Sequence, residues 1–173
     1  MRSERGVTMV ELLVTLTIAA ILLAIGAPSM RDFILSNRVG GAGNQLMASM
    51  SLARSEAIKR GRTVTLCKSA NGTSCTTSGG WEQGWIVFAD GNTQGTLDGS
   101  GATADVALRV VQTFSGLTIS GGANFPNWLS YTSTGASDGA SLNNGTFSVC
   151  SSPSGRDVII NDTGRVRSSA VTC

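Results

Sequence analysis

The chain has 173 residues with 22 glycines, few aromatic residues (5%) and few charged residues (14%), and its formal net charge is +2. It contains no histidine, which excludes histidine-dependent acid–base catalysis and histidine-ligated zinc sites. This composition suits a turn-rich β domain better than an α/β enzyme, and the length allows one globular core beside a long N-terminal segment.

The N-terminal segment combines a short basic leader, MRSERG, with a long apolar run. From Val7 to Ala27 the only ionisable side chain is Glu11. As a helix these residues would extend roughly 31 Å, which is long enough to cross a bilayer. A lone carboxylate at that depth costs roughly 2 to 3 kcal/mol or more, so Glu11 requires a partner. No small-residue cleavage site follows the run, so we expect the segment to be retained.

Pro28 ends the apolar run but not the predicted helix. Proline removes one intrahelical hydrogen bond, so we expect a kink or local loosening around residues 24–28. Beyond it, apolar or small residues recur every three or four positions, which predicts an amphipathic continuation to about Arg60 that ends near Gly61. The residues on this expected buried face are Val39, Ala42, Leu46, Met50, Ala53 and Ala57.

After residue 62 the pattern becomes that of short β-strands. Each run is rich in β-branched or aromatic residues and is bounded by turn-forming residues. We therefore predict an α+β fold in which one antiparallel sheet packs its apolar face against residues 39–57 of the helix. Residues 133–145 have the composition of a flexible loop. The predicted strands cover residues 63–66, 85–88, 106–111, 117–119, 146–149 and 158–160.

The four cysteines all follow the apolar segment, as expected if this part of the chain is exported to an oxidising compartment. Three pairings are possible. We favour Cys67 with Cys75 and Cys150 with Cys173, because each pair closes a modest loop and the second restrains the C-terminus. Zinc is disfavoured because the chain has neither C-x-x-C spacing nor histidine.

The leader ending in Gly6, the glutamate at Glu11, the apolar run and Pro28 together resemble the N-terminus of type IV pilins and pseudopilins. The resemblance implies that a prepilin peptidase cuts after Gly6 and methylates the new N-terminal residue, Val7. It also implies that Glu11 docks the subunit into a filament and that Pro28 marks a kinked part of the helix. Val7 departs from the family, where most members have phenylalanine.

Two further segments, LARSEAIKRGRTVTLC (Leu52–Cys67) and GWIVFADGNTQGTLD (Gly84–Asp98), resemble the FimT and GspH class of minor pilins and pseudopilins. The resemblance implies a type IV pilin fold with a leader at 1–6, an apolar transmembrane and filament-core helix at 7–34, and a globular domain at 35–173. It also implies a single pass through the bacterial inner membrane with a periplasmic domain before assembly. The assembled subunit would then lie in a cell-surface pilus filament, with the tip as one candidate position.

Near the C-terminus, Gly164-Arg165-Val166-Arg167 resembles the GRxR motif of DNA-binding, FimT-like minor pilins that capture DNA for natural transformation. By that match Arg165 and Arg167 contact double-stranded DNA and Gly164 belongs to the same motif. In an extended segment, residues two apart point the same way and lie about 6 to 7 Å apart, so both guanidinium groups could reach neighbouring phosphates. Two solvated arginines on an edge strand would explain the same residues without DNA.

The alternative function is that of a structural minor pilin or pseudopilin that primes or caps a type IV pilus or a type II secretion pseudopilus without binding DNA. An enzyme is not expected, because the chain lacks G-x-S-x-G and a phosphate-binding glycine loop, and no cofactor is implied. Residues Asp90, Asn92, Gln94, Gly95 and Asp98 partly follow a calcium loop. Gly101 replaces its bidentate glutamate, which favours a polar hairpin turn over a metal site.

Overall fold

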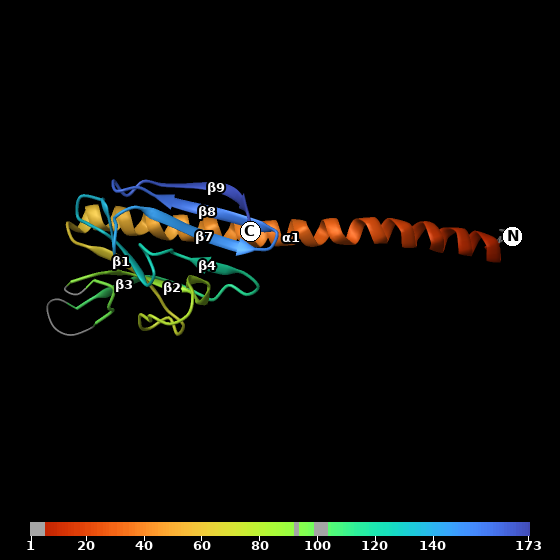
Figure 1. The fold of residues 1–173 in the computed structure, drawn as a ribbon. Helices are drawn as coiled ribbons and strands as arrows, with labels where there is room; N and C mark the ends of the chain where they lie inside the picture. The colour runs from red at the N-terminus through yellow and green to blue at the C-terminus, as the bar shows by residue number, and fades with distance from the viewer. Residues whose placement is uncertain (1–5, 92–93, 99–103) are drawn as a thin grey trace.

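The computed structural model describes residues 6–91, 94–98 and 104–173, without the side chains of residues 27–29. It consists of one long helix and two antiparallel sheets that both pack on the helix's C-terminal half (Figure 1). The N-terminal half of the helix extends away from the sheets (Figure 1). The α+β prediction is therefore confirmed.

Helix α1 runs from Met9 to Arg60 as a single element, which confirms that it continues past residue 28. It ends where predicted, because Gly61 adopts a left-handed conformation (φ 62°) and its amide bonds to the carbonyl of Ile58. The six residues of the predicted apolar face are each at most 2% exposed. No side chain described between residues 6 and 34 is buried, so the core of the domain does not depend on that half of the helix.

The larger sheet has five strands in the order β3-β2-β1-β5-β6. Its central strands β1 and β2 are buried along their whole length, and Trp85 donates from Nε1 to the hydroxyl of Ser49 on the helix (2.9 Å). A 3₁₀ turn at Trp81–Gln83 precedes β2. The strand bounds are β1 Val64–Lys68, β2 Trp85–Ala89, β3 Val106–Val111, β5 Trp128–Tyr131 and β6 Ser137–Gly139.

The second sheet has four strands in the order β4-β7-β8-β9. Its inner face joins the same hydrophobic core, where the Phe147 ring lies edge-on to Trp81 and stacks on Phe125. Among the strands that the structure describes, β9 pairs with β8 alone and forms an edge of this sheet. The strand bounds are β4 Thr118–Ser120, β7 Gly145–Ser151, β8 Ser154–Ile160 and β9 Val166–Thr172.

Two sequence-based predictions about the sheets were wrong. The strands form two sheets and not one, because β7, β8 and β9 pair with one another and with β4 instead of joining the five-stranded order, and strands of both sheets contact helix α1. Residues 133–145 are not entirely a loop, since residues 137–139 form β6. That short polar segment becomes a strand because it pairs with β5 and because the buried Ser137 donates its hydroxyl hydrogen bond to the carbonyls of Asn143 and Asn161.

Candidate functional site

The hairpin turn between β8 and β9 carries the predicted DNA-binding motif. Asn161 organises this turn, because its side-chain Oδ1 accepts hydrogen bonds from the amide of Arg165 (2.8 Å) and the hydroxyl of Thr163 (2.9 Å). Its carbonyl accepts the amide of Gly164 (2.8 Å), and its own amide donates to the carbonyl of Arg165 (3.2 Å). The backbone that leads into Arg165 is therefore held by local bonds.

Gly164 is the one position of this turn where the fold requires glycine. It is buried, its φ is 76°, and a Cβ placed on it would collide with the carbonyl oxygen of Gly135. The same Cβ would also lie 3.0 Å from the ring of Tyr131. A side chain would therefore push the turn away from the five-stranded sheet and move the residue that follows.

Arg165 and Arg167 lie on the same outer face of the four-stranded sheet. Arg167 lies opposite Ile159 in the β8–β9 ladder. Two residues closer to the turn, on the same face, Arg165 lies opposite Asn161. These four residues line a hollow of about 160 Å³. Both arginines are exposed, and neither forms an ion pair with any carboxylate in the described ranges. Two unneutralised guanidinium groups thus share one surface.

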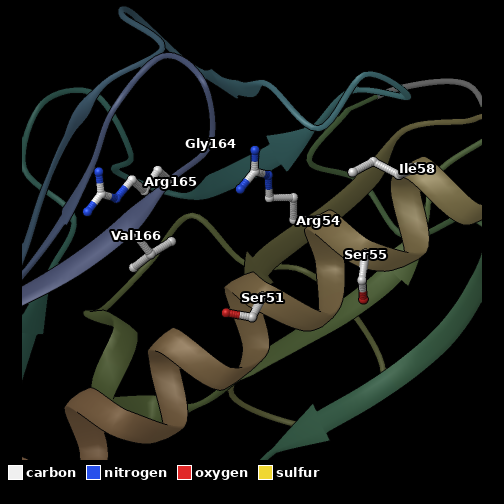
Figure 2. Close-up of a pocket in the computed structure, with 7 residues that line it drawn as sticks. All are labelled: Ser51, Arg54, Ser55, Ile58, Gly164, Arg165 and Val166. Carbon is white, nitrogen blue, oxygen red and sulfur yellow. The ribbon is translucent and has the colours of Figure 1, made fainter.

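Arg165 also borders a second hollow, of about 360 Å³, between β9 and helix α1. Figure 2 shows its lining, in which the Arg54 side chain rises from the helix towards the Gly164 turn while Arg165 points away from Arg54. The lining residues are Ser51, Arg54, Ser55, Ile58, Gly164, Arg165 and Val166.

Arg54 connects the helix to both sheets. Its Nε donates to the carbonyl of Gly135 (2.9 Å) and its Nη2 to the carbonyl of Thr163 (2.8 Å). Sequence analysis gave Arg54 no role beyond its place in the predicted amphipathic helix. Its spacing carries no signal for this role, because the two acceptors lie 81 and 109 residues further along the chain.

Tyr131 lies beneath the same turn with its side chain fully buried. Its hydroxyl has no hydrogen-bond partner among the described residues. Burial raises the pKa of this hydroxyl above its ordinary value, and the nearby charge of Arg54 opposes the rise only in part.

At the other end of the molecule, Thr8 caps helix α1. Its hydroxyl accepts the amide of Glu11 (3.3 Å), while the Glu11 carboxylate accepts the amide of Thr8 (3.5 Å), which together form a capping box. Gly6 and Val7 precede the helix and are exposed. The helix continues through residue 28, and the predicted kink at Pro28 stays a prediction.

Both predicted disulfides are present. Cys67 pairs with Cys75 (Cα–Cα 5.5 Å) and Cys150 with Cys173 (5.8 Å). The second disulfide links Cys173, directly after β9, to Cys150 in β7. It therefore restrains the C-terminal end of the strand that carries Arg167.

The calcium-like segment falls partly outside the described residues, at Asn92 and Gly101. In the described part of this segment, the backbone is held by Asp105, which the calcium-loop pattern did not include. Its carboxylate accepts the amides of Gly91 (2.8 Å) and Asp98 (3.0 Å). The described ranges contain no cluster of three or more metal-binding side chains.

Comparison with known proteins gives consistent results. The model of the family described as "Type II transport protein GspH" matches residues 42–164, and that of the "Prokaryotic N-terminal methylation motif" matches residues 1–27. The chain is 32% identical over 127 residues to Fimbrial protein Q of Moraxella bovis, covering 64% of this chain and 79% of that protein.

Among solved structures, the fold resembles the type IV minor pilin FimU of Pseudomonas aeruginosa in two crystal forms. The TM-scores are 0.58 and 0.56 at 22% sequence identity. The alignments cover 79% and 78% of this chain and 96% and 98% of the FimU chains.

Proposed function

The chain belongs to the GspH family of type II transport proteins and is a minor type IV pilin or pseudopilin, and we propose that it binds extracellular DNA during natural transformation. Binding occurs through Gly164, Arg165 and Arg167 and is independent of DNA sequence. The observation that carries this proposal is the shared outer-face hollow of the two arginines, neither of which has a carboxylate partner in the described ranges.

The chemistry of the site suits a phosphate backbone better than bases. Two guanidinium groups on one face of an extended segment can each take a phosphate oxygen pair, and such contacts position DNA without reading its sequence. The turn is held by Asn161, Gly164 and Arg54, so little ordering accompanies binding.

The charge balance limits the affinity. Without Arg2, Glu4 and Arg5 of the leader, the chain has 11 basic and 10 acidic residues, or a formal charge of +1. Contact with about two to four phosphates gives weak binding that falls steeply with salt. Useful capture then needs several subunits or neighbouring tip proteins acting together.

The N-terminal segment supplies the subunit's placement. The methylation-motif match and the apolar helix fit a membrane-anchored pilin that assembles with other pilins into a filament. As part of the proposal, prepilin peptidase cuts after Gly6 and methylates Val7. Before assembly the helix lies in the inner membrane with the domain in the periplasm, and Glu11 then pairs with the N-terminal amine of a neighbouring subunit.

A second candidate function is a purely structural minor pilin or pseudopilin. It is favoured by the position of β9 at a sheet edge, where arginines prevent pairing with another sheet.

The deciding experiment titrates double-stranded DNA into the domain that begins at residue 35. We expect Arg165→Ala with Arg167→Ala to abolish binding and the wild-type slope of log Kd against log salt to be about 2 to 4, as two to four phosphate contacts predict. The matched control is Arg38→Ala with Arg109→Ala, which removes the same charge from residues outside both hollows. Equal DNA affinity of the wild-type and Arg165/Arg167 variants, with circular dichroism confirming that both are folded, would favour the structural role.

A further inference from the structure

We propose that Arg54 is the positioning residue of the DNA-binding turn, which it holds against the helix and the five-stranded sheet. This proposal rests on the proposed DNA binding by Arg165 and Arg167. Arg54 itself contacts no DNA. It orders residues 161–164, so that the backbone entering Arg165 has one conformation before DNA arrives.

The two hydrogen bonds of the Arg54 guanidinium are the first support for this positioning role. Its two bonds reach turns that belong to different sheets, since Gly135 lies between β5 and β6 and Thr163 between β8 and β9. Arg54 as a residue is half-buried, and both acceptors of its guanidinium are neutral carbonyls. A planar fork with donors at fixed separation can span two such oxygens, whereas a lysine ammonium is a single point.

The packing around the turn is the second support. On the side of the five-stranded sheet, Ser137 donates from its amide to the carbonyl of Asp162 (3.3 Å) and from its hydroxyl to that of Asn161 (2.7 Å). Gly164 packs closely on Gly135. These contacts hold the turn to one sheet, and Arg54 adds the link to helix α1. Without that link the turn and its neighbour at residues 132–136 lose their common anchor.

A direct phosphate contact by Arg54 is the competing explanation, because Arg54 and Arg165 line one hollow. The directions of the side chains argue against it, since the Arg54 guanidinium faces the Gly164 turn and Arg165 points away (Figure 2). The two explanations differ in salt dependence. Loss of one phosphate contact lowers the slope of log Kd against log salt by about 0.9, whereas loss of a positioning residue leaves the slope unchanged.

The test compares Arg54→Met and Arg54→Lys in the domain from residue 35, with Arg156→Met as the matched control. Arg156 is half-buried like Arg54 and links the same hairpin to the helix by donating to Asn44 (3.2 Å), but it lies in the middle of β8, away from the turn. DNA affinity is measured at several salt concentrations. Amide hydrogen exchange is followed at Gly164 and Ser137, whose amides bond within and onto the turn.

We expect Arg54→Met to weaken DNA binding about three- to tenfold with the wild-type salt slope, because the turn must be ordered on binding. Exchange at Gly164 and Ser137 should rise about tenfold or more, as expected for a local opening. Arg54→Lys should resemble Arg54→Met in both measurements, and Arg156→Met should leave the exchange of both amides unchanged.

Three results would overturn the proposal: a slope lowered by about 0.9, full restoration of affinity by lysine, or unchanged exchange in Arg54→Met. Failure of the wild-type domain to bind DNA would instead reject the proposed function. The exchange comparison would then decide separately whether Arg54 orders the turn.

Discussion

Tyr131 illustrates how one residue beneath the turn affects stability. Its ring fills space next to Gly164, but its hydroxyl is buried without a hydrogen-bond partner in the described part of the chain. An unsatisfied buried hydroxyl costs roughly 1 to 3 kcal/mol relative to a hydrated one. The ring therefore stabilises the domain while its oxygen destabilises it.

We predict that Tyr131→Phe keeps the fold and raises the free energy of unfolding by about 1 kcal/mol at pH 7, because it removes the unpaired oxygen and keeps the ring. Urea denaturation of both proteins measures the difference. A loss of more than about 1 kcal/mol would indicate that the hydroxyl has a stabilising partner.

The same pair should differ in pH dependence. Burial raises the pKa of the Tyr131 hydroxyl in the folded state, whereas the unfolded chain titrates near pH 10. Above about pH 10 the unfolded state loses this proton while the folded state keeps it, so wild-type stability falls as pH rises. The advantage of Tyr131→Phe should therefore grow above about pH 10, and a constant difference would contradict the assignment.

At the scale of elements, the β8–β9 hairpin is attached to the rest of the molecule at several points. Arg54 holds its turn, Arg156 reaches from β8 across Gly43 to the helix, and the disulfide from Cys150 to Cys173 closes its far end. Because β9 is an exposed edge strand in which no residue is buried and only Val166 is half-buried, these attachments support its pairing with β8.

Removal of the second disulfide should release this strand. For Cys150→Ser with Cys173→Ser we expect a loss of about 2 to 4 kcal/mol in unfolding free energy and faster amide exchange along residues 166–172. The control, Cys67→Ser with Cys75→Ser, removes the disulfide that starts from β1 in the other sheet. It should leave amide exchange in β9 unchanged. Equal protection of β9 in both variants would show that strand pairing alone holds it.

The strands that the sequence predicted are those whose own residues favour β-structure, whereas a strand that depends on its partner was missed. The six predicted strands are all present, since each is a β-branched or aromatic run that buries apolar side chains. Strands β5, β6 and β9 were missed. Residues 137–139 are Ser-Asp-Gly, and they form a strand only because Leu129–Tyr131 supplies a ladder of partners.

At the scale of the whole molecule, helix α1 has two different halves. From Met9 to Ile34 its large apolar side chains are exposed, including Met9 at 80% and Leu23 at 71%, whereas from Val39 onward one face is buried. The helix is long and apolar enough to cross a membrane, judged by length and composition. An apolar surface of this extent requires lipid or neighbouring helices to cover it.

Glu11 should matter for assembly and not for cleavage of the leader. We expect Glu11→Ala to yield a chain that is cut after Gly6 but poorly incorporated into filaments, because the neighbour's terminal amine loses its buried partner. Glu11→Gln, which keeps the shape without the charge, should show the same defect. The measurement is the ratio of processed subunit in sheared filaments to that in the cell envelope, and a normal ratio would argue against docking through Glu11.

The sequence alone determined the long helix, its buried face and its end at Gly61, and it favoured the two disulfide pairings that the structure contains. These features depend on local spacing, on the conformational freedom of glycine or on loop length, all of which can be read along the chain. It also identified Arg165 and Arg167 as candidates for contact with DNA.

Only the tertiary structure decided that the strands form two sheets and that Arg54 joins them at the turn before Arg165. A hydrogen bond depends on the positions of donor and acceptor in space, and Arg54's acceptors are brought to it by two separate hairpins. Local spacing carries no trace of such a contact, because folding alone brings residues so distant in the chain together.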